Sequence, residues 1–286
     1  MARPPGHGIR LSHYDFGATT VYAARMDQRF AYCCYVPEAY DEEAARTYPL
    51  LVVVHGTERG MTTYRDRFAD LAEEVGCIVL APLFPAGITG PKELSSYKLL
   101  RAGELHYDAV LLSMVEEVAE RYRIAEGGFC LYGFSGGGHF AHRFYYLHPE
   151  RLRAVSIGAP GVVTLLDFER DWWVGVRDFA DIFGKAIDLE AMRRVPVHMA
   201  VGAEDTETWE ITLEPGDAWW MEGANIAGAN RQDRMASLRA SLEAHRIAVR
   251  QDVVSGARHR GGEVLAPVKS FLREVLAPPS AAAARS

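Results

Sequence analysis

Apolar and polar positions follow two different periods along the chain, and these periods predict strands followed by helices. Residues 50–54 are Leu-Leu-Val-Val-Val, a continuous run typical of a strand buried on both faces of a parallel sheet. Shorter apolar runs predict further strands at 30–36, 77–81, 129–132, 154–157, 195–201 and 247–254. Apolar stripes at helical spacing predict helices at 64–75, 107–122, 140–147, 235–242 and 264–275. This alternation predicts an α/β fold, with a mostly parallel central sheet and helices on both faces.

The pattern changes between residues 162 and 194, where aromatic side chains are interspersed with acidic ones. A run of this length between two sheet strands is too long for a plain connection, so we interpret it as a cap or lid insertion. A second inserted aromatic segment covers about 206–228. We therefore expect a single α/β domain over 1–286, with a core of about 28–161 and 195–276. The tails, 1–12 and 277–286, are expected to be flexible.

A Gly-x-Ser-x-Gly motif separates the apolar run at 129–132 from the helical stripe that begins at Phe140. A serine between a strand and a helix lies in a sharp turn, which exposes its hydroxyl at a helix N-terminus. The motif could instead be a glycine-rich turn with an incidental serine, or a phosphate-binding loop. A phosphate-binding loop needs a Lys-Ser or Lys-Thr pair after its last glycine, and His139-Phe140 does not supply one. The context favours Ser135 as a nucleophile.

Overall charge and composition narrow the class of protein. The 286 residues carry a net charge of −7 and their basic residues are scattered, which argues against a nucleic-acid partner. We find no signal peptide and no apolar run of membrane-spanning length, so we expect a soluble, cytoplasmic protein with no membrane partner. The four cysteines fall in or beside apolar runs without Cys-x-x-Cys spacing, as expected for small buried residues in a reducing compartment.

Two further residues complete a set suited to nucleophilic catalysis. Asp205 follows the predicted strand at 195–201, and His259 follows the one at 247–254. The carboxyl ends of parallel strands meet at one edge of a sheet, so both loops should lie beside Ser135. A serine nucleophile needs a base to take its proton and an acid to orient that base. Glu204 could replace its neighbour Asp205 in the second role.

The order serine, aspartate, histidine is that of the α/β-hydrolase superfamily, which the chain resembles from about residue 28 to 276. The resemblance rests on His55-Gly56, on the Ser135 motif, on Gly202-Ala203-Glu204-Asp205 and on the spacing to His259. The Ser135 motif and residues 228–234 are also similar to feruloyl esterases and polyhydroxyalkanoate depolymerase-like hydrolases.

The resemblance implies a serine esterase with a catalytic triad. Ser135 would be the nucleophile, His259 the general base and Asp205 the orienting carboxylate. The oxyanion hole would use the backbone N–H groups of Gly136 and Thr57. Lipase-like members carry more glycines where this chain has Thr57-Glu58-Arg59, so Gly56 is the alternative second donor.

Other candidates surround this set. His55 is expected to brace the oxyanion loop, and His139 to face the site or its wall. The remaining candidates for substrate binding are the aromatic residues Phe134, Trp172, Trp173, Trp219 and Trp220. The Trp-Trp pairs could equally be the core of the cap, but in segments that overhang the site they suggest an apolar pocket. We expect His106, His142, His148 and His245 at helix surfaces.

The sequence thus predicts a serine hydrolase that cleaves carboxylic esters of small apolar or aromatic substrates through an acyl-enzyme on Ser135. A lactonase, amidase or perhydrolase would use the same residues. A catalytically silent protein of this fold, binding a small apolar ligand or a partner, is the alternative from another class. No His/Asp/Glu cluster has metal-ligand spacing, so no metal or other cofactor is expected. An acidic surface with exposed cap aromatics is compatible with a homo-oligomer.

Overall fold

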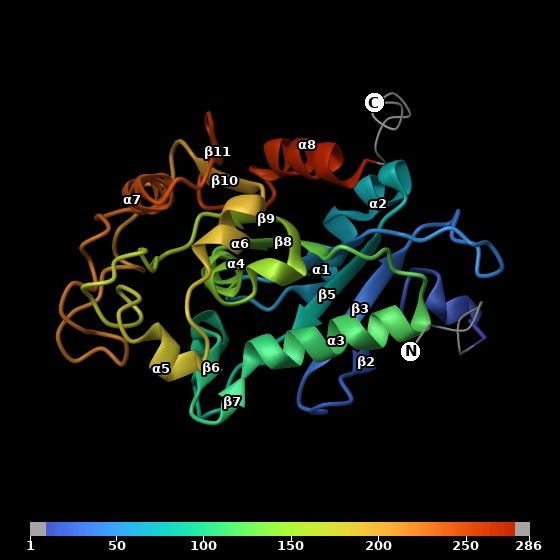
Figure 1. The fold of residues 1–286 in the computed structure, drawn as a ribbon, viewed down its shortest axis with the longest axis horizontal. Helices are drawn as coiled ribbons and strands as arrows, with labels where there is room; N and C mark the ends of the chain where they lie inside the picture. The colour runs from blue at the N-terminus through green and yellow to red at the C-terminus, as the bar shows by residue number, and fades with distance from the viewer. Residues whose placement is uncertain (1–9, 278–286) are drawn as a thin grey trace.

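The computed structural model describes residues 10–277 and is built around one twisted sheet (Figure 1). Its strand order is β1-β3-β5-β4-β8-β9-β10-β11, and β2 pairs with β3. All pairs from β5 to β11 are parallel, whereas β1, β2 and β5 run antiparallel to β3. The strands are β1 Gly17–Ala18, β2 Tyr22–Ala23, β3 Ala31–Val36, β4 Leu50–Val54, β5 Ile78–Leu83, β8 Phe129–Phe134, β9 Leu152–Gly158, β10 Val197–Gly202 and β11 Val249–Val254. The predicted mostly parallel sheet is confirmed. A separate hairpin pairs β6 Arg101–Ala102 with β7 Leu105–His106.

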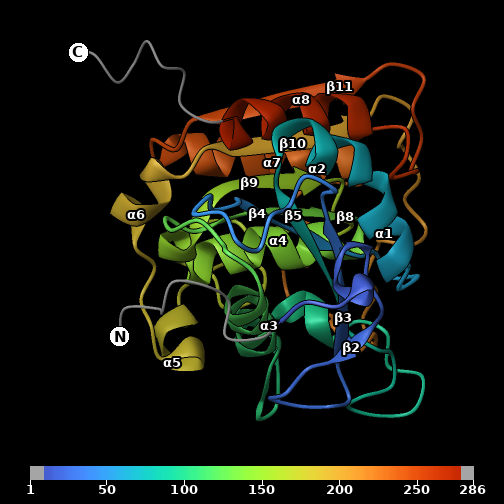
Figure 2. The ribbon, with the colours of Figure 1, turned by 90° about the vertical axis from the view of Figure 1, so that its right-hand side faces the viewer.

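Helices cover both faces of the sheet, as the sequence predicts. Helices α1, α2 and α8 pack on one face of the sheet, and α3 and α4 pack on the other (Figure 1 and Figure 2). The helices are α1 Met61–Arg67, α2 Ala69–Val75, α3 Tyr107–Arg121, α4 Gly136–Leu147, α5 Phe179–Phe183, α6 Leu189–Arg194, α7 Arg231–Ala244 and α8 Leu265–Leu276. Short 3-10 helices are η1 His13–Asp15, η2 Ser96–Leu99 and η3 Pro149–Arg151. No helix within residues 10–277 is long and apolar enough to cross a membrane.

One predicted helix is divided in two. The apolar stripe at 64–75 belongs to both α1 and α2, which meet at Phe68. Phe68 leaves the helical conformation at φ −109° and ψ 5°. Its ring is fully buried, with its centroid 5.2 Å from that of Tyr132 in β8. The bend at Phe68 thus accompanies a core contact that the periodicity of the stripe does not encode.

Helix α4 is buried along its whole length, which corrects the expectation for His142. Its Nδ1 bonds the Gly138 carbonyl at 2.8 Å, and its Nε2 accepts the Thr164 N–H at 3.1 Å. The helix lies between the sheet and the loop that follows β9, so neither of its sides reaches solvent. Burial holds the pKa of His142 well below its ordinary value. His106, His148 and His245 are all partly buried. His106 lies in β7 rather than on a helix, whereas His148 and His245 directly follow α4 and α7 and are hydrogen-bonded.

The two inserted segments pack against each other. Val162, Trp173 and Val174 of the first form a small apolar cluster with Ala224 of the second. The indole N–H of Trp173 also donates to the Trp219 carbonyl at 3.0 Å. Both segments consist mostly of turns, and the first contains α5 and α6. The predicted tails, 1–12 and 277–286, fall outside the described residues except for 10–12 and 277.

Candidate active site

Ser135 lies in a tight turn between β8 and α4, with φ 55° and ψ −116°. Its N–H donates to the Gly158 carbonyl at 2.8 Å, which ties the turn to β9. The neighbouring glycines permit this geometry, because a Cβ on Gly133 would lie 2.1 Å from the Gly137 oxygen. A Cβ on Gly137 would lie 2.1 Å from the Val54 oxygen. The close backbone approach therefore requires glycine at both positions.

A continuous hydrogen-bonded chain joins the serine, the histidine and the aspartate that the sequence singles out. Ser135 Oγ lies 2.9 Å from His259 Nε2, and His259 Nδ1 lies 2.7 Å from Asp205 Oδ2. An ionised carboxylate only accepts hydrogen bonds, so Nδ1 carries the imidazole proton. Nε2 is then free to accept the Ser135 hydroxyl proton. The loops after β8, β10 and β11 bring the three residues together at the carboxyl edge of the sheet.

Arg231, at the start of α7, holds the buried Asp205 from the other side. Its Nη1 lies 3.3 Å from Asp205 Oδ1, and its Nη2 bonds Glu210 at 2.5 Å. Asp205 and Arg231 are almost completely buried, so each needs the opposite charge of the other. This role of Arg231 was not predicted from the sequence. The available signal was the helical spacing that places an arginine on the same stripe as Met235 and Leu238.

Two backbone N–H groups beside Ser135 have no acceptor within residues 10–277. They belong to Gly136, the first residue of α4, and to Thr57, in the loop after β4. The two backbones are close, since a Cβ on Gly136 would lie 3.0 Å from the Thr57 nitrogen. The alternative donor, Gly56, directs its N–H to the Tyr64 hydroxyl, and this contact lowers the Tyr64 pKa against the larger opposite effect of burial. Thr57 is therefore better placed than Gly56 to bind a substrate oxygen.

His55 and Arg59 brace the loop that carries Thr57. His55 Nε2 accepts the Phe84 N–H at 2.9 Å, and Nδ1 bonds the Gly56 carbonyl at 2.8 Å. Burial lowers the pKa of His55 to about 4, so the ring is neutral and Nδ1 carries the proton. The Arg59 guanidinium donates to the carbonyls of Thr57, Phe84 and Leu94. This bracing role of His55 agrees with the sequence-based expectation.

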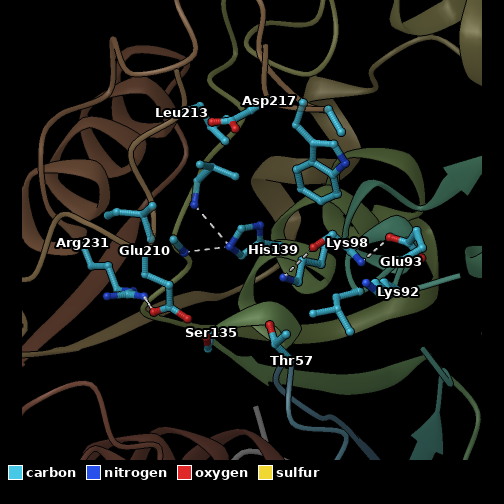
Figure 3. Close-up of a pocket in the computed structure, with 17 residues that line it drawn as sticks. Thr57, Lys92, Glu93, Lys98, Ser135, His139, Glu210, Leu213, Asp217 and Arg231 are labelled. Atoms are coloured by element: carbon cyan, nitrogen blue, oxygen red, sulfur yellow. Dashed lines mark hydrogen bonds and ion pairs between the residues drawn. The ribbon is translucent and has the colours of Figure 1, made fainter. Parts of the chain in front are cut away.

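Two pockets meet at Ser135. The first, of about 400 Å³, is named the Lys98 pocket and lies between Ser135 and the segment 210–219. Figure 3 shows Ser135 and Thr57 at one end of it, Leu213 and Asp217 at the opposite end, and Lys98 and His139 between them. The second, of about 440 Å³, is named the His259 pocket and contains His259 and Phe134. The hydroxyl of Ser135 is thus accessible from two sides.

Only some of the predicted wall residues line these pockets. Trp219 and His139 line the Lys98 pocket, and Phe134 lines the His259 pocket. The Phe134 ring stacks on the His259 imidazole with 4.9 Å between the ring centroids. His139 Nε2 accepts the N–H groups of Gly161 and Val162 at 2.8 and 3.2 Å. Burial keeps the pKa of His139 well below its ordinary value. The His139 imidazole is therefore neutral, and it fixes the backbone of Gly161 and Val162 in the pocket wall.

The expectation that Trp172, Trp173 and Trp220 bind substrate needs correction. Trp172 packs edge-on against Phe179 and Phe183 of α5. Trp173 is buried in the cluster that joins the inserted segments, and Trp220 is 43% exposed. None of the three lines either pocket at Ser135. The first inserted segment reaches the Lys98 pocket only through Val162. Trp172 and Trp173 therefore serve the packing of the insertions.

A second Ser–His–Asp chain crosses the sheet and provides an internal comparison. Ser156 Oγ lies 2.8 Å from His198 Nδ1, and His198 Nε2 lies 3.0 Å from Asp252 Oδ2. These residues project from β9, β10 and β11. Ser156 and His198 are fully buried, and the Phe271 ring stacks on His198 at 4.9 Å. Ser156 and His198 line neither pocket at Ser135, so we call this series the closed Ser–His–Asp chain and use it as a control for the first.

Neither metal ligands nor disulfides occur in the described part of the chain. No group of three or more His, Cys, Asp or Glu residues within residues 10–277 could hold a metal ion. Cys33, Cys34, Cys77 and Cys130 are free and buried. Burial raises the pKa of Cys77 and of Cys130 to about 12, so both thiols remain protonated at neutral pH and are poor nucleophiles.

Comparisons with known proteins place this geometry in a known fold. No family model matches the sequence, and no match was found among the curated proteins. Among solved structures, the chain is similar to the poly(3-hydroxybutyrate) depolymerase LpqC from Bordetella parapertussis, with a TM-score of 0.69, 23% identity, and 90% of this chain and 87% of that chain covered. It is also similar to poly(aspartic acid) hydrolase-1 from Sphingomonas sp. KT-1, with a TM-score of 0.69, 21% identity and coverage of 93% and 98%. A ferulic acid esterase from Anaeromyces mucronatus has a TM-score of 0.57, 16% identity and coverage of 90% and 89%. The chain therefore has the α/β-hydrolase fold.

Proposed function

We propose that the protein is a serine hydrolase that cleaves carboxylic esters through an acyl-enzyme on Ser135. The observation that carries this proposal is the hydrogen-bonded series from Ser135 through His259 to Asp205, which opens into two pockets. Beside it lie two backbone N–H groups that have no acceptor among the described residues. The esterases and depolymerases among the similar structures support the reaction class.

The geometry suggests a role for each group. Ser135 Oγ attacks the ester carbonyl while its proton passes to His259 Nε2. The developing oxyanion accepts hydrogen bonds from the N–H groups of Thr57 and Gly136. His259, held in the required tautomer by Asp205, then protonates the departing alcohol. Water, activated by the same imidazole, releases the acid from the acyl-enzyme.

The two pockets suit the two halves of an ester. The departing oxygen must come within hydrogen-bonding reach of His259 Nε2 to receive its proton. His259 lines one pocket and is absent from the other. The alcohol part of the substrate therefore belongs in the His259 pocket, and the acyl part in the Lys98 pocket. An oxyanion hole formed by Thr57 serves both, since Thr57 lines each pocket.

Hydrolysis of p-nitrophenyl esters, from acetate to decanoate, tests the proposal. Ser156, the serine of the second Ser–His–Asp chain, provides the control variant. Ser135→Ala should lower kcat by about 10⁴-fold or more, because the nucleophile is lost while the binding pockets remain. Ser156→Ala, in the closed Ser–His–Asp chain, should retain turnover. A folded Ser135→Ala protein with wild-type activity would overturn the mechanism. Wild-type protein without activity on any ester would instead favour a ligand-binding protein of this fold.

A further inference from the structure

Lys98 is a buried cation on the wall of the pocket that we assign to the acyl group. It belongs to η2, and only 9% of its surface is exposed. The Arg143 guanidinium fixes its backbone through a 2.7 Å bond to the Lys98 carbonyl. Its ammonium lies 6.0 Å from the centre of the Trp219 ring, across the same pocket. The side chain is therefore held in place and faces the cavity rather than bulk solvent.

No carboxylate of the described residues lies within ion-pair distance of this ammonium. Within residues 10–277, the Lys98 ammonium makes one hydrogen bond, to Ser95 Oγ at 3.1 Å, and no ion pair within 4.0 Å. Burial and the charges of Arg59 and Arg143 lower the pKa of Lys98 to about 8, although the charges of Glu210 and Glu93 act in the opposite direction. At neutral pH the group is thus still mostly an ammonium. A buried ammonium with donors to spare is costly unless an anion reaches it.

The acidic residues of the pocket are engaged elsewhere. The Glu93 carboxylate accepts from the backbone N–H groups of Ser95 and Ser96 and from the Ser96 hydroxyl. Glu210 pairs with Arg231, and Asp217 accepts the Glu214 N–H at 2.7 Å. In Figure 3, Glu93 lies away from Ser135, and Asp217 lies at the far end of the pocket. Among the described residues of this pocket, the Lys98 ammonium is therefore a buried cation whose charge is not taken up by a direct ion pair.

We propose that Lys98 binds a carboxylate at the end of the acyl group, so that the preferred substrates are half-esters of short dicarboxylic acids. The inference rests on the proposed function, and it names the acyl class of the same site. Apolar side chains of Val162, Ile211 and Leu213 line the pocket and suit the methylene groups of such an acid. Lys92, which is exposed on the same pocket wall, adds a second positive charge for attraction of the anion.

Paired esters separate recognition of the charge from hydrolysis itself. The anionic substrates are the p-nitrophenyl half-esters of succinate, glutarate and adipate, and the neutral partners are the same esters with the far carboxyl methylated. The wild-type enzyme should have a higher kcat/KM for the anionic member of at least one pair. In Lys98→Met, the ratio of kcat/KM for the anionic ester to kcat/KM for the neutral ester should fall by about tenfold or more, mainly through KM. A change of this size corresponds to the loss of one charge-assisted hydrogen bond.

Three controls make the result specific. Lys98→Arg should retain part of the preference, because the positive charge remains. Lys269→Met removes a lysine from α8, outside both pockets, and should leave the ratio unchanged. A further pair of substrates carries the charge on the alcohol: the acetyl esters of 4-hydroxybenzoate and of its methyl ester. Lys98→Met should not alter the ratio of kcat/KM between these two esters.

A binding measurement does not depend on turnover. Glutarate should raise the melting temperature of Ser135→Ala, and should do so less for Ser135→Ala/Lys98→Met. Equal ratios in wild type and Lys98→Met, or a loss confined to the alcohol-side pair, would overturn the inference while leaving the esterase proposal intact. Failure of the wild-type enzyme to cleave either member of any pair would count against the proposed function.

Discussion

Arg231 Nη1 lies 3.3 Å from Asp205 Oδ1, on the opposite side of the carboxylate from His259. Both side chains are buried at the carboxyl edge of the sheet, and the same guanidinium also binds Glu210. The carboxylate thus has one oxygen for the imidazole and one for the arginine. Arg231 acts on the site through Asp205, as a positioning residue.

Replacing Arg231 by Met should lower kcat more than it changes KM, because Asp205 loses its second partner and holds His259 less firmly. It should also destabilise the fold by about 3–5 kcal/mol, the usual cost of breaking a buried ion pair from one side. Arg231→Lys should restore part of kcat. Steady-state kinetics and urea unfolding measure both effects. An unchanged kcat in a folded Arg231→Met protein would contradict this positioning role.

The two Ser–His–Asp chains make a matched pair for testing the carboxylate. Asp205→Asn should lower kcat by about 10⁴-fold, because an amide no longer selects the His259 tautomer with its proton on Nδ1. Asp252→Asn changes the corresponding residue of the closed chain and should leave kcat within about twofold of wild type. Equal losses in the two variants would mean that the open chain has no special role.

The sheet and the three residues at its carboxyl edge could be predicted from the sequence. The continuous run Leu50–Val54 becomes strand β4 with the expected bounds, because a strand buried on both faces leaves a purely apolar signature. The order of Ser135, Asp205 and His259 along the strands was enough to place them at one edge. Local apolar patterns and a parallel topology were therefore enough to predict the fold and the positions of these three residues.

What could not be predicted depends on contacts between distant segments. The packing of Trp172 and the burial of Lys98 depend on how loops far apart in the sequence contact α4, where Arg143 meets both residues, and no local period records these contacts. The same holds for His142, which has the spacing of a surface residue in a helix that has no exposed side. Ser156 lies in a plain apolar run, so its bond to His198 is visible only in the register of β9 and β10.

Buried neutral histidines should make stability fall in mild acid. Burial holds the pKa of His55 at about 4, below its ordinary 6.5, and keeps that of His139 and His142 well below this value. The unfolded chain then binds more protons, so stability is complete above about pH 6.5 and declines as the pH falls toward 4. His55 alone corresponds to about 3 kcal/mol over that range.

Urea unfolding at pH 7.5, 6.5, 5.5 and 5.0 measures this loss. The window lies above the ordinary pKa of aspartate and glutamate side chains, about 4, so histidine protonation dominates it. A constant free energy of unfolding from pH 7.5 to 5.0 would mean that these rings can accept protons in the folded state.

The turn at Ser135 should tolerate no side chain at Gly137. An added Cβ would lie 2.1 Å from the Val54 oxygen and 3.0 Å from the His55 oxygen, both backbone atoms of the central strand and its loop. Gly137→Ala should therefore cost more than about 3 kcal/mol or prevent folding. At Gly90 an added Cβ meets no atom within 4 Å, so Gly90→Ala should change stability by less than about 1 kcal/mol. Similar unfolding midpoints for the two variants would refute the close approach at Gly137.

Reaction with a fluorophosphonate, followed by intact mass and peptide mapping, measures whether Ser135 is an activated nucleophile. We expect one adduct per chain, located on Ser135, with labelling strongly slowed in Asp205→Asn and absent in Ser135→Ala. Ser156 should carry no adduct. If a well-folded wild-type protein remains unlabelled, or carries its adduct on another residue, Ser135 is not an activated nucleophile.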